Sequence, residues 1–473
     1  SFVIWNAYFV DNTLAGITQQ DTIGLSLFSD KVSAVFRPLE ASTYTITVSE
    51  EGPSTISAKY IVDMTVQVST VVVVGLRSIE FAFQPNWTEG YTETYEYMTN
   101  VLTSENDKEQ RISLKKYPRT YIDYSVVLSD HRAREVIAKM WKWPNLSLLI
   151  PTWPDSAKLL NSITTVGATT FDFEDLSNRR FAVGQSIILI EDTGLEGKRE
   201  ILSIDTITNN NITTSFPSQN TWSNKTVKAY PMVAVRLKSK FVLESITNNI
   251  HTAKVSFLLD EKPIINPVEV TDTYRNIGIL TKSTNYLEDV VYSVSQKQSQ
   301  FDGGTGLTTQ YITEGDIAST KQAHSFYLNS KELIQNHINY LNYLKGKFKP
   351  LWLPTWIEDI RLVRNILASD TEILLNYMQA ESAYLNINRR DIMIQLVDGT
   401  QFFRRVVYGQ NFKDGTESMS MDVALNIEVT LAEIQLVCFV ALVRSDSDRT
   451  KIKWLDDNNA VSISQFKSIN HDV

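Results

Sequence analysis

Apolar and polar positions alternate through the first eighty residues, as is typical of β-strands. Residues 43–48 read Thr-Tyr-Thr-Ile-Thr-Val, and residues 58–68 and 70–79 are further strand candidates. The turn signal Glu-Gly-Pro-Ser at 51–54 separates the first of these strands from the others. Helical periodicity is missing from the stretch. The pattern predicts an N-terminal β-sandwich or barrel-like domain over residues 1–80.

Two later segments repeat their apolar residues about every 3.6 positions, which predicts helices. The first begins at Ser129 or Asp130, either of which is a plausible N-cap, and ends before Pro144. The second spans residues 330–344. Strand-like patterns precede both, at 121–128 and at 325–328. The apolar stripe of the first helix comprises Ala133, Ile137, Met140 and Trp141.

A Pro-Thr-Trp motif follows each predicted helix. Leu-Ile-Pro-Thr-Trp ends at Trp153, and Trp-Leu-Pro-Thr-Trp ends 203 residues later at Trp356. Strand patterns then follow at 181–190 and at 385–397, each closed by an acidic-Gly turn. Two copies at this spacing indicate a duplicated domain, since a solenoid needs more and shorter repeats. The repeated motif comprises Pro151, Thr152, Trp153 and Asp155 in the first copy, and Pro354, Thr355, Trp356 and Asp359 in the second.

These patterns predict a mainly β protein with a few helices. An N-terminal β domain occupies 1–80, and a first repeat module with a strand-rich insertion occupies 81–260. Residues 261–320, which carry Pro263 and Pro267, form a linker and loop region. A second module and a C-terminal tail occupy 321–473. The length of 473 residues agrees with about three domains.

Composition narrows the range of functions. One cysteine, Cys438, excludes an intrachain disulfide and a cysteine-based zinc site. The net charge of −9 argues against a protein whose main task is to bind nucleic acid backbone. The longest apolar run, 431–443, is shorter than the roughly 20 residues of a membrane helix. We therefore expect a soluble chain, without a targeting segment, folded in a reducing cytoplasm.

The sequence offers few candidates for chemistry. No pair among the five histidines has metal-ligand spacing, and Cys438 lies in an apolar run that predicts a buried, inert thiol. The glycine-rich stretch 303–306 lacks the Lys-Ser/Thr of a phosphate loop, so a hairpin or connecting loop is expected. We predict no catalytic, cofactor-binding or metal-binding residues and no cofactor. The five histidines are His131, His251, His324, His337 and His471.

The repeated motif itself allows two interpretations. Asp155 and the Glu358-Asp359 pair could serve as glycosidase carboxylates, and the two tryptophans as platforms for sugar rings. Each carboxylate also stands where a helix or turn begins, so a capping role is the preferred interpretation. A large ring beside a fixed turn usually fills the adjacent core, so we predict that Trp153 and Trp356 are buried.

Several motifs, taken in their order, resemble tail proteins of long-tailed bacteriophages, namely the distal tail or upper baseplate family of minor tail proteins. The resemblance runs from about residue 80 onward, through 83–87, 98–104, 109–111, 118–119, 346–359 and 437–448. The first copy departs from the pattern, with Pro154-Asp155 where the second has Ile357-Glu358-Asp359. The family motif residues in the first half are Pro85, Trp87, Glu109, Gln110, Arg111, Pro118 and Arg119.

The resemblance implies a structural virion protein of a siphophage and not an enzyme. It implies a homo-oligomeric ring, with a hexamer favoured over a trimer, that joins the tail tube protein to the baseplate hub and tail fibre proteins. Such a protein is assembled in the bacterial cytoplasm and resides in the virion tail, with neither nucleic acid sequence recognition nor membrane insertion. The alternatives are a carbohydrate-binding or carbohydrate-cleaving tail-tip protein and a generic intracellular β-rich scaffold.

Overall fold

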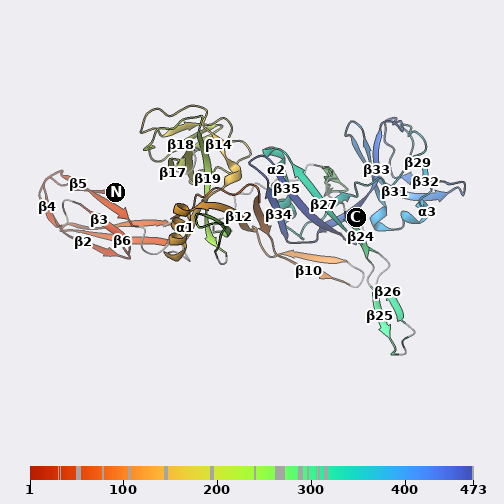
Figure 1. Ribbon diagram of the computed structural model, residues 1–473, viewed down its shortest axis with the longest axis horizontal. Helices are drawn as coiled ribbons and strands as arrows, with labels where there is room; N and C mark the ends of the chain where they lie inside the picture. The colour runs from red at the N-terminus through yellow and green to blue at the C-terminus, as the bar shows by residue number, and fades with distance from the viewer. Residues whose placement is uncertain are drawn as a thin grey trace.

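The described part of the protein is mainly β and contains three α-helices, which confirms the prediction of a mainly β fold with a few helices. Figure 1 shows the arrangement of these elements. The computed structural model describes residues 1–29, 31, 33–49, 55–76, 79–104, 108–142, 147–191, 197–238, 241–260, 272–285, 291–295, 298–304, 306, 309–313 and 318–470.

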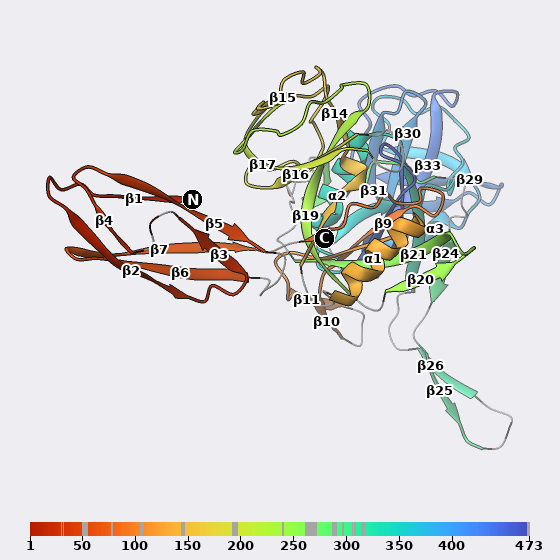
Figure 2. The ribbon, with the colours of Figure 1, turned by 60° about the vertical axis from the view of Figure 1, so that its left-hand side comes forward.

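The N-terminal domain is a sandwich of two small antiparallel sheets at one end of the molecule (Figures 1 and 2). The inward-facing residues of the alternating strands, among them Leu14, Phe36 and Tyr44, fill the space between the sheets. One sheet has the order β1-β5-β3 and the other β4-β2-β6-β7. The strands are β1 (Phe2–Trp5), β2 (Asn12–Gln20), β3 (Leu25–Phe28), β4 (Ala34–Phe36), β5 (Ala41–Val48), β6 (Thr55–Met64) and β7 (Gln67–Leu76).

In the first module, one helix connects two strands in the chain order. Its helix begins after a long strand and is followed by the short strand that ends at the Pro-Thr-Trp motif. The elements are β8 (Ile79–Glu80), β9 (Tyr91–Glu96), β10 (Thr99–Thr103), β11 (Glu109–Ser113), β12 (Arg119–Ser129), α1 (Asp130–Lys142), β13 (Leu148–Pro151), η1 (Trp153–Asp155), β19 (Val227–Leu237), β20 (Val242–Ser245) and β21 (Ile250–Leu259).

The second module repeats the main strands and the helix in the same order, and its helix is capped by the Ser330 hydroxyl. Its elements are β22 (Thr273–Tyr274), β23 (Ile277–Gly278), β24 (Val291–Ser295), β25 (Gln298–Asp302), β26 (Thr309–Thr313), β27 (Ser319–Leu328), α2 (Lys331–Leu344), β28 (Leu351–Pro354), β33 (Ile434–Ser445), β34 (Arg449–Trp454) and β35 (Ala460–Ser468).

The strand registers show that the two modules are related. In the first, β13 pairs with β19 and places Pro151 opposite Met232; in the second, β28 pairs with β33 and places Pro354 opposite Val440. Strands β12 and β27 precede the helices and pair in the same way with β21 and β35. The backbone of Phe81 donates to Leu149, as that of Leu280 donates to Trp352. The duplication therefore extends to single hydrogen bonds.

Each Pro-Thr-Trp motif leads into an inserted β unit with a core of its own. Both insertions repeat the same isolated bridges, since Leu159 pairs with Phe173 as Leu362 pairs with Leu375. The first insertion contains β14 (Ala157–Lys158), β15 (Thr170–Asp172), β16 (Ser186–Glu191), β17 (Arg199–Thr208) and β18 (Asn211–Thr214). The second contains β29 (Glu372–Asn376), α3 (Ala380–Ala383), η2 (Ile387–Arg389), β30 (Asp391–Leu396), β31 (Gln401–Asn411) and β32 (Thr416–Met421).

Three details differ from the sequence prediction. The strand expected at 58–68 contains a turn at 65–66, and β6 and β7 form a hairpin around it. Trp141 points into solvent, because the buried face of α1 runs through Ala133 and Val136. The described residues of 261–320, which were expected to form a linker and loop region, include the short strands β22 to β26 and the start of β27. The glycine-rich stretch begins after β25, which forms a hairpin with β26.

Two buried histidines, His324 on β27 and His337 on α2, are expected to make the stability of the fold depend on pH. Burial lowers the pKa of His324 to about 4 and that of His337 to about 3. The unfolded chain binds these protons from about pH 6.5 downward, so stability is complete above that pH and falls with acidification. We expect a loss of about 1.4 kcal/mol per pH unit and per histidine between about pH 6.5 and 4.

Urea unfolding of the His324→Gln, His337→Gln variant between pH 7 and pH 4.5 checks this expectation. The variant should lose less stability on acidification than the unaltered chain. His131→Gln, which alters an exposed ring, is the matched control. If the double variant loses as much free energy of unfolding between pH 7 and pH 4.5 as the unaltered chain does, the prediction is contradicted.

Candidate functional site: the junction between the two modules

One strand of the first module is shared by both modules. Strand β9 pairs on one side with β12 and on the other with β34 of the second module, both antiparallel. Tyr91 stands opposite Tyr124 in the first pairing and opposite Trp454 in the second. The modules therefore form one continuous sheet. Eight strands of this sheet follow in the order β20, β21, β12, β9, β34, β35, β27 and β24. Strands β21 and β35 also pair, beyond β20 and β34, with β19 and β33.

A buried ionic network lies beneath this shared strand. Arg180 of the first insertion binds Glu93 on β9, with 2.7 Å between Nη2 and Oε1, and Asp155 of the motif, with 2.5 Å between Nε and Oδ2. The Tyr95 hydroxyl donates to the other Glu93 oxygen at 2.7 Å. Lys331 of α2 completes the network at 3.6 Å from Asp155. The network thus ties the motif, the insertion and the second module to one strand.

The carboxylates of this network stabilise the charged forms of the two cations beside them. Burial alone would lower the pKa of the Arg180 guanidinium, but Asp155 and Glu93 raise it well above its usual value. Burial lowers the pKa of Lys331, and Asp155 opposes that shift. The Lys331 ammonium also lies 4.5 Å from the ring centroid of Trp454 and donates to the Pro154 carbonyl. Both cations therefore have their partners within the junction.

The two motif aspartates have different roles. The predicted capping role is wrong for Asp155, whose carboxylate binds Arg180 and Lys331, because the fold brings both cations from distant segments. Asp359 does receive hydrogen bonds from a backbone amide, that of Phe439 at 3.0 Å, and from the Thr355 hydroxyl. Burial raises the pKa of Asp359, and these bonds oppose the shift.

Both motif tryptophans are buried, as predicted, with 2% of each exposed. Trp153 packs edge-on against Tyr230, with 5.0 Å between ring centroids. Trp356 lies in the cluster that contains Cys438 and Met393. Tyr230 and Cys438 hold equivalent places on β19 and β33. The rings therefore occupy equivalent core positions, and neither offers an exposed face to a sugar.

Several residues of the ordered sequence motifs at 98–104, 109–111, 346–359 and 437–448 meet at the far end of the junction. The Asp448 carboxylate, between β33 and β34, accepts from the backbone and hydroxyl of Thr99 at 2.9 Å each, and from the Lys347 backbone at 3.0 Å. Arg444 forms a two-pronged ion pair with Glu109, at 2.6 and 2.8 Å. These contacts fix the β10–β11 hairpin of the first module to the second. We call this group of five residues the hairpin latch.

The other motif residues surround the junction. Pro85 and Pro118 are buried before β9 and β12, and Trp87 is half-buried. Gln110 and Arg111 follow Glu109 on β11, where burial lowers the pKa of Arg111. Arg119 begins β12. The sequence prediction missed Arg180 and Glu93, because no local pattern distinguishes them from exposed charges.

Gly346 is required by the latch. It has a φ of +64°, and a Cβ atom there would lie 2.5 Å from Asp448 Oδ1 and 3.0 Å from Asp448 Cα. We expect Gly346→Ala to cost about 1–2 kcal/mol for the left-handed backbone alone, and more for the contact with Asp448. Gly399→Ala is the control, since Gly399 has a φ of +89° with open space around it. Urea unfolding should show the larger loss at Gly346; equal losses would contradict the contact argument.

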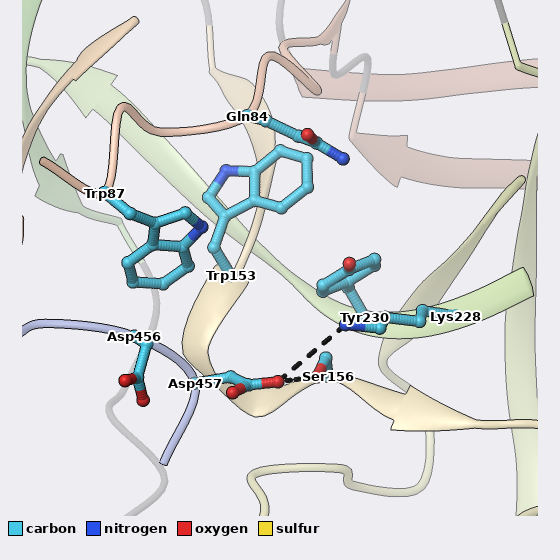
Figure 3. Close-up of a pocket in the computed structure, with 8 residues that line it drawn as sticks. All are labelled: Gln84, Trp87, Trp153, Ser156, Lys228, Tyr230, Asp456 and Asp457. Carbon is cyan, nitrogen blue, oxygen red and sulfur yellow. Dashed lines mark hydrogen bonds and ion pairs between the residues drawn. The ribbon is translucent and has the colours of Figure 1, made fainter. Parts of the chain in front are cut away.

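A cavity of about 310 Å³ opens beside the network (Figure 3). Trp153, Lys228 and Tyr230 of the first module face Asp456 and Asp457 on the β34–β35 turn. Asp457 accepts from Ser156 at 3.1 Å and lies 3.8 Å from Lys228, while Asp456 binds amides of its own turn. Asp457 therefore holds the turn against the first module, and Asp456 stabilises the turn itself.

The other candidates for chemistry lie apart from the junction. Burial raises the pKa of the Cys438 thiol to about 12, in agreement with the predicted buried thiol. Within the described residues, histidine, cysteine and acidic side chains form no group of three that could hold a metal ion. None of the helices described is both long and apolar enough to cross a membrane.

Comparison with known proteins adds no family. No protein-family model matches the chain, and no curated protein matches it. The sheet shared by the modules and the hairpin latch are thus the features on which a functional proposal depends.

Proposed function

We propose that the protein is a structural component of a bacteriophage tail tip, where copies form a ring between the tail tube and the baseplate hub with its receptor-binding fibres. The observation that carries the proposal is the joining of two related modules side by side in one sheet. Such a junction is a repeatable contact, and rings of subunits are built from repeated contacts.

The hairpin latch gives the proposal a second support. Thr99, Glu109, Lys347, Arg444 and Asp448 belong to the motifs that resemble distal tail proteins, and they come from three distant segments of the chain. Their convergence at one contact gives these motifs a common task, which is to hold the two modules together. A task of this kind suits a protein that bears load within a particle.

Two measurements test the proposal. Mass photometry of the purified chain should show a discrete oligomer, and gold-labelled antibody should mark the tail end of the phage that encodes it. The purified oligomer should bind the tail tube protein of the same phage, with an unrelated tube protein as control. A monomer at all concentrations, absent from the particles, would overturn the proposal.

The carbohydrate alternative makes a different prediction. It expects binding on a glycan array or release of sugar, and loss of either on replacing Trp153 or Trp356 without loss of fold. The burial of both rings argues against that result. Glycan binding that survives both replacements would direct attention to other surfaces of the chain.

A further inference from the structure

The run of eight strands described above has an end strand on each side, β20 and β24. Within the part of the chain that the structure describes, β24 pairs only with β27, and β20 only with β21. Val291 and Val294 on β24 are 57% and 60% exposed. Proteins usually protect an edge strand with lysine, proline or a bulge, because a bare edge pairs with other strands. Neither lysine nor proline occurs in β24 or β20.

These end strands are the counterparts of the two strands that join the modules. Strand β24 pairs with β27 as β9 pairs with β12, so Val291 corresponds to Thr92. Strand β20 pairs with β21 as β34 pairs with β35, so Glu244 corresponds to Lys453. Within the chain, β9 and β34 pair with each other and place Thr92 opposite Lys453. Strands β24 and β20 are therefore equivalent to β9 and β34, but they lie at opposite ends of the run of eight strands and do not pair with each other within one chain.

We propose that β24 of one copy pairs with β20 of a second copy, and repeats the β9–β34 junction between chains. The partner of this edge is thus the protein itself, in head-to-tail order. The register of the internal junction places Val291 opposite Glu244 and Ser293 opposite Val242. Neighbouring strands alternate in direction through the sheet, so an antiparallel contact between the two ends continues it without interruption.

The side chains at the two ends suit this contact. Tyr292 and Leu243 would face each other on the core side, where Glu93 and Ile452 meet in the internal junction. Both are half-buried in the single chain, and Leu243 already packs against the main core. Glu244 and Val291 would meet on the opposite face, and both are exposed. A second copy would therefore extend an existing core and cover apolar edge residues.

A head-to-tail contact forms a closed ring when its rotation closes. Each chain brings two modules, so the ring holds twice as many modules as chains. The sixfold arrangement that the tail resemblance implies is then made by three chains, each with two modules, and not by six chains. This stoichiometry rests on the ring of the proposed function, whereas the strand contact follows from the register alone.

Disulfide trapping tests the contact. The sole native thiol, Cys438, is buried and leaves a low background. Opposed residues of an antiparallel pair have Cα atoms about 4.5–5.5 Å apart, within the range of a disulfide. Oxidation of the Val291→Cys, Glu244→Cys variant should convert most of the protein to covalent multimers on non-reducing electrophoresis. Each single variant should give at most a dimer through its one introduced thiol.

Two further double-cysteine variants serve as the positive and the negative control. Thr92→Cys, Lys453→Cys should form an intrachain disulfide without change of mass, since these residues are paired in the structure. Ser295→Cys, Glu244→Cys, displaced by four residues or about 13 Å along the strand, should give no multimers. Monomers only in the test variant, beside an intrachain bond in the first control, would overturn the proposal. Multimers from the displaced pair would overturn the register.

Charge at the same position gives an independent measurement. Val291→Glu would face Glu244, and like charges directly opposite weaken strand pairing, whereas Val291→Lys would face an opposite charge. The concentration for half assembly, from mass photometry, should be about 2- to 5-fold higher for the Glu variant than for the Lys variant. Assembly that is equal in both, with no trapping, would place the ring contact elsewhere and leave the tail-tip function standing. Monomers throughout, absent from particles, would remove both.

Discussion

Replacement of Arg180 by alanine is expected to lower the free energy of unfolding by about 3–5 kcal/mol. The guanidinium is the counter-charge of Glu93 and Asp155, which are both buried. Without it, two carboxylates stay in the core with Tyr95 and Lys331 as their remaining close polar partners. The loss should appear in urea unfolding at neutral pH, monitored by tryptophan fluorescence.

Two further variants separate the network from a general effect of charge. Arg236→Ala removes an exposed ion pair with Asp260 and should cost at most about 1 kcal/mol. The triple variant Arg180→Met, Glu93→Gln, Asp155→Asn removes all three charges and should recover much of the loss. If Arg180→Ala costs no more than Arg236→Ala, the carboxylates are hydrated and the network does not hold the junction.

Local pattern was sufficient to predict the long helix and the Pro-Thr-Trp turn of each module. The helices at 130 and 331 follow from their apolar period. The Pro-Thr-Trp repeat located two equivalent turns, because the motif is contained within five residues. Burial of both tryptophans followed from the same turn. What these features share is that each is determined by neighbours in sequence.

The junction could not be predicted in this way. Strand β9 pairs with β34, about 350 residues further along the chain, and alternation of polar residues does not specify a distant partner. Arg180 belongs to a loop of the insertion and looks like any surface arginine in the sequence. The strands of 272–313 were missed for a related reason. Their short, polar sequences become strands only beside β27 and β28 or as a hairpin.

The duplicated rings should contribute comparably to stability, each more than an exposed ring of the same type. Trp153→Ala and Trp356→Ala should each cost about 3–5 kcal/mol, the range for large core aromatics. The reason is common to both, since each ring is 2% exposed and fills the space behind a proline turn. Trp141→Ala is the control, because Trp141 is 84% exposed and its loss should stay within about 0.5 kcal/mol.

Comparison of the two core variants also tests whether the modules are coupled. Trp153 belongs to the large core that includes residues of both modules, whereas Trp356 lies in a smaller cluster around Cys438. Loss of Trp153 should therefore lower the unfolding midpoint of the whole junction. Loss of Trp356 should act first on the second module, detectable as earlier modification of the Cys438 thiol in urea. Equal exposure of Cys438 in both variants would show that the two cores unfold as one unit.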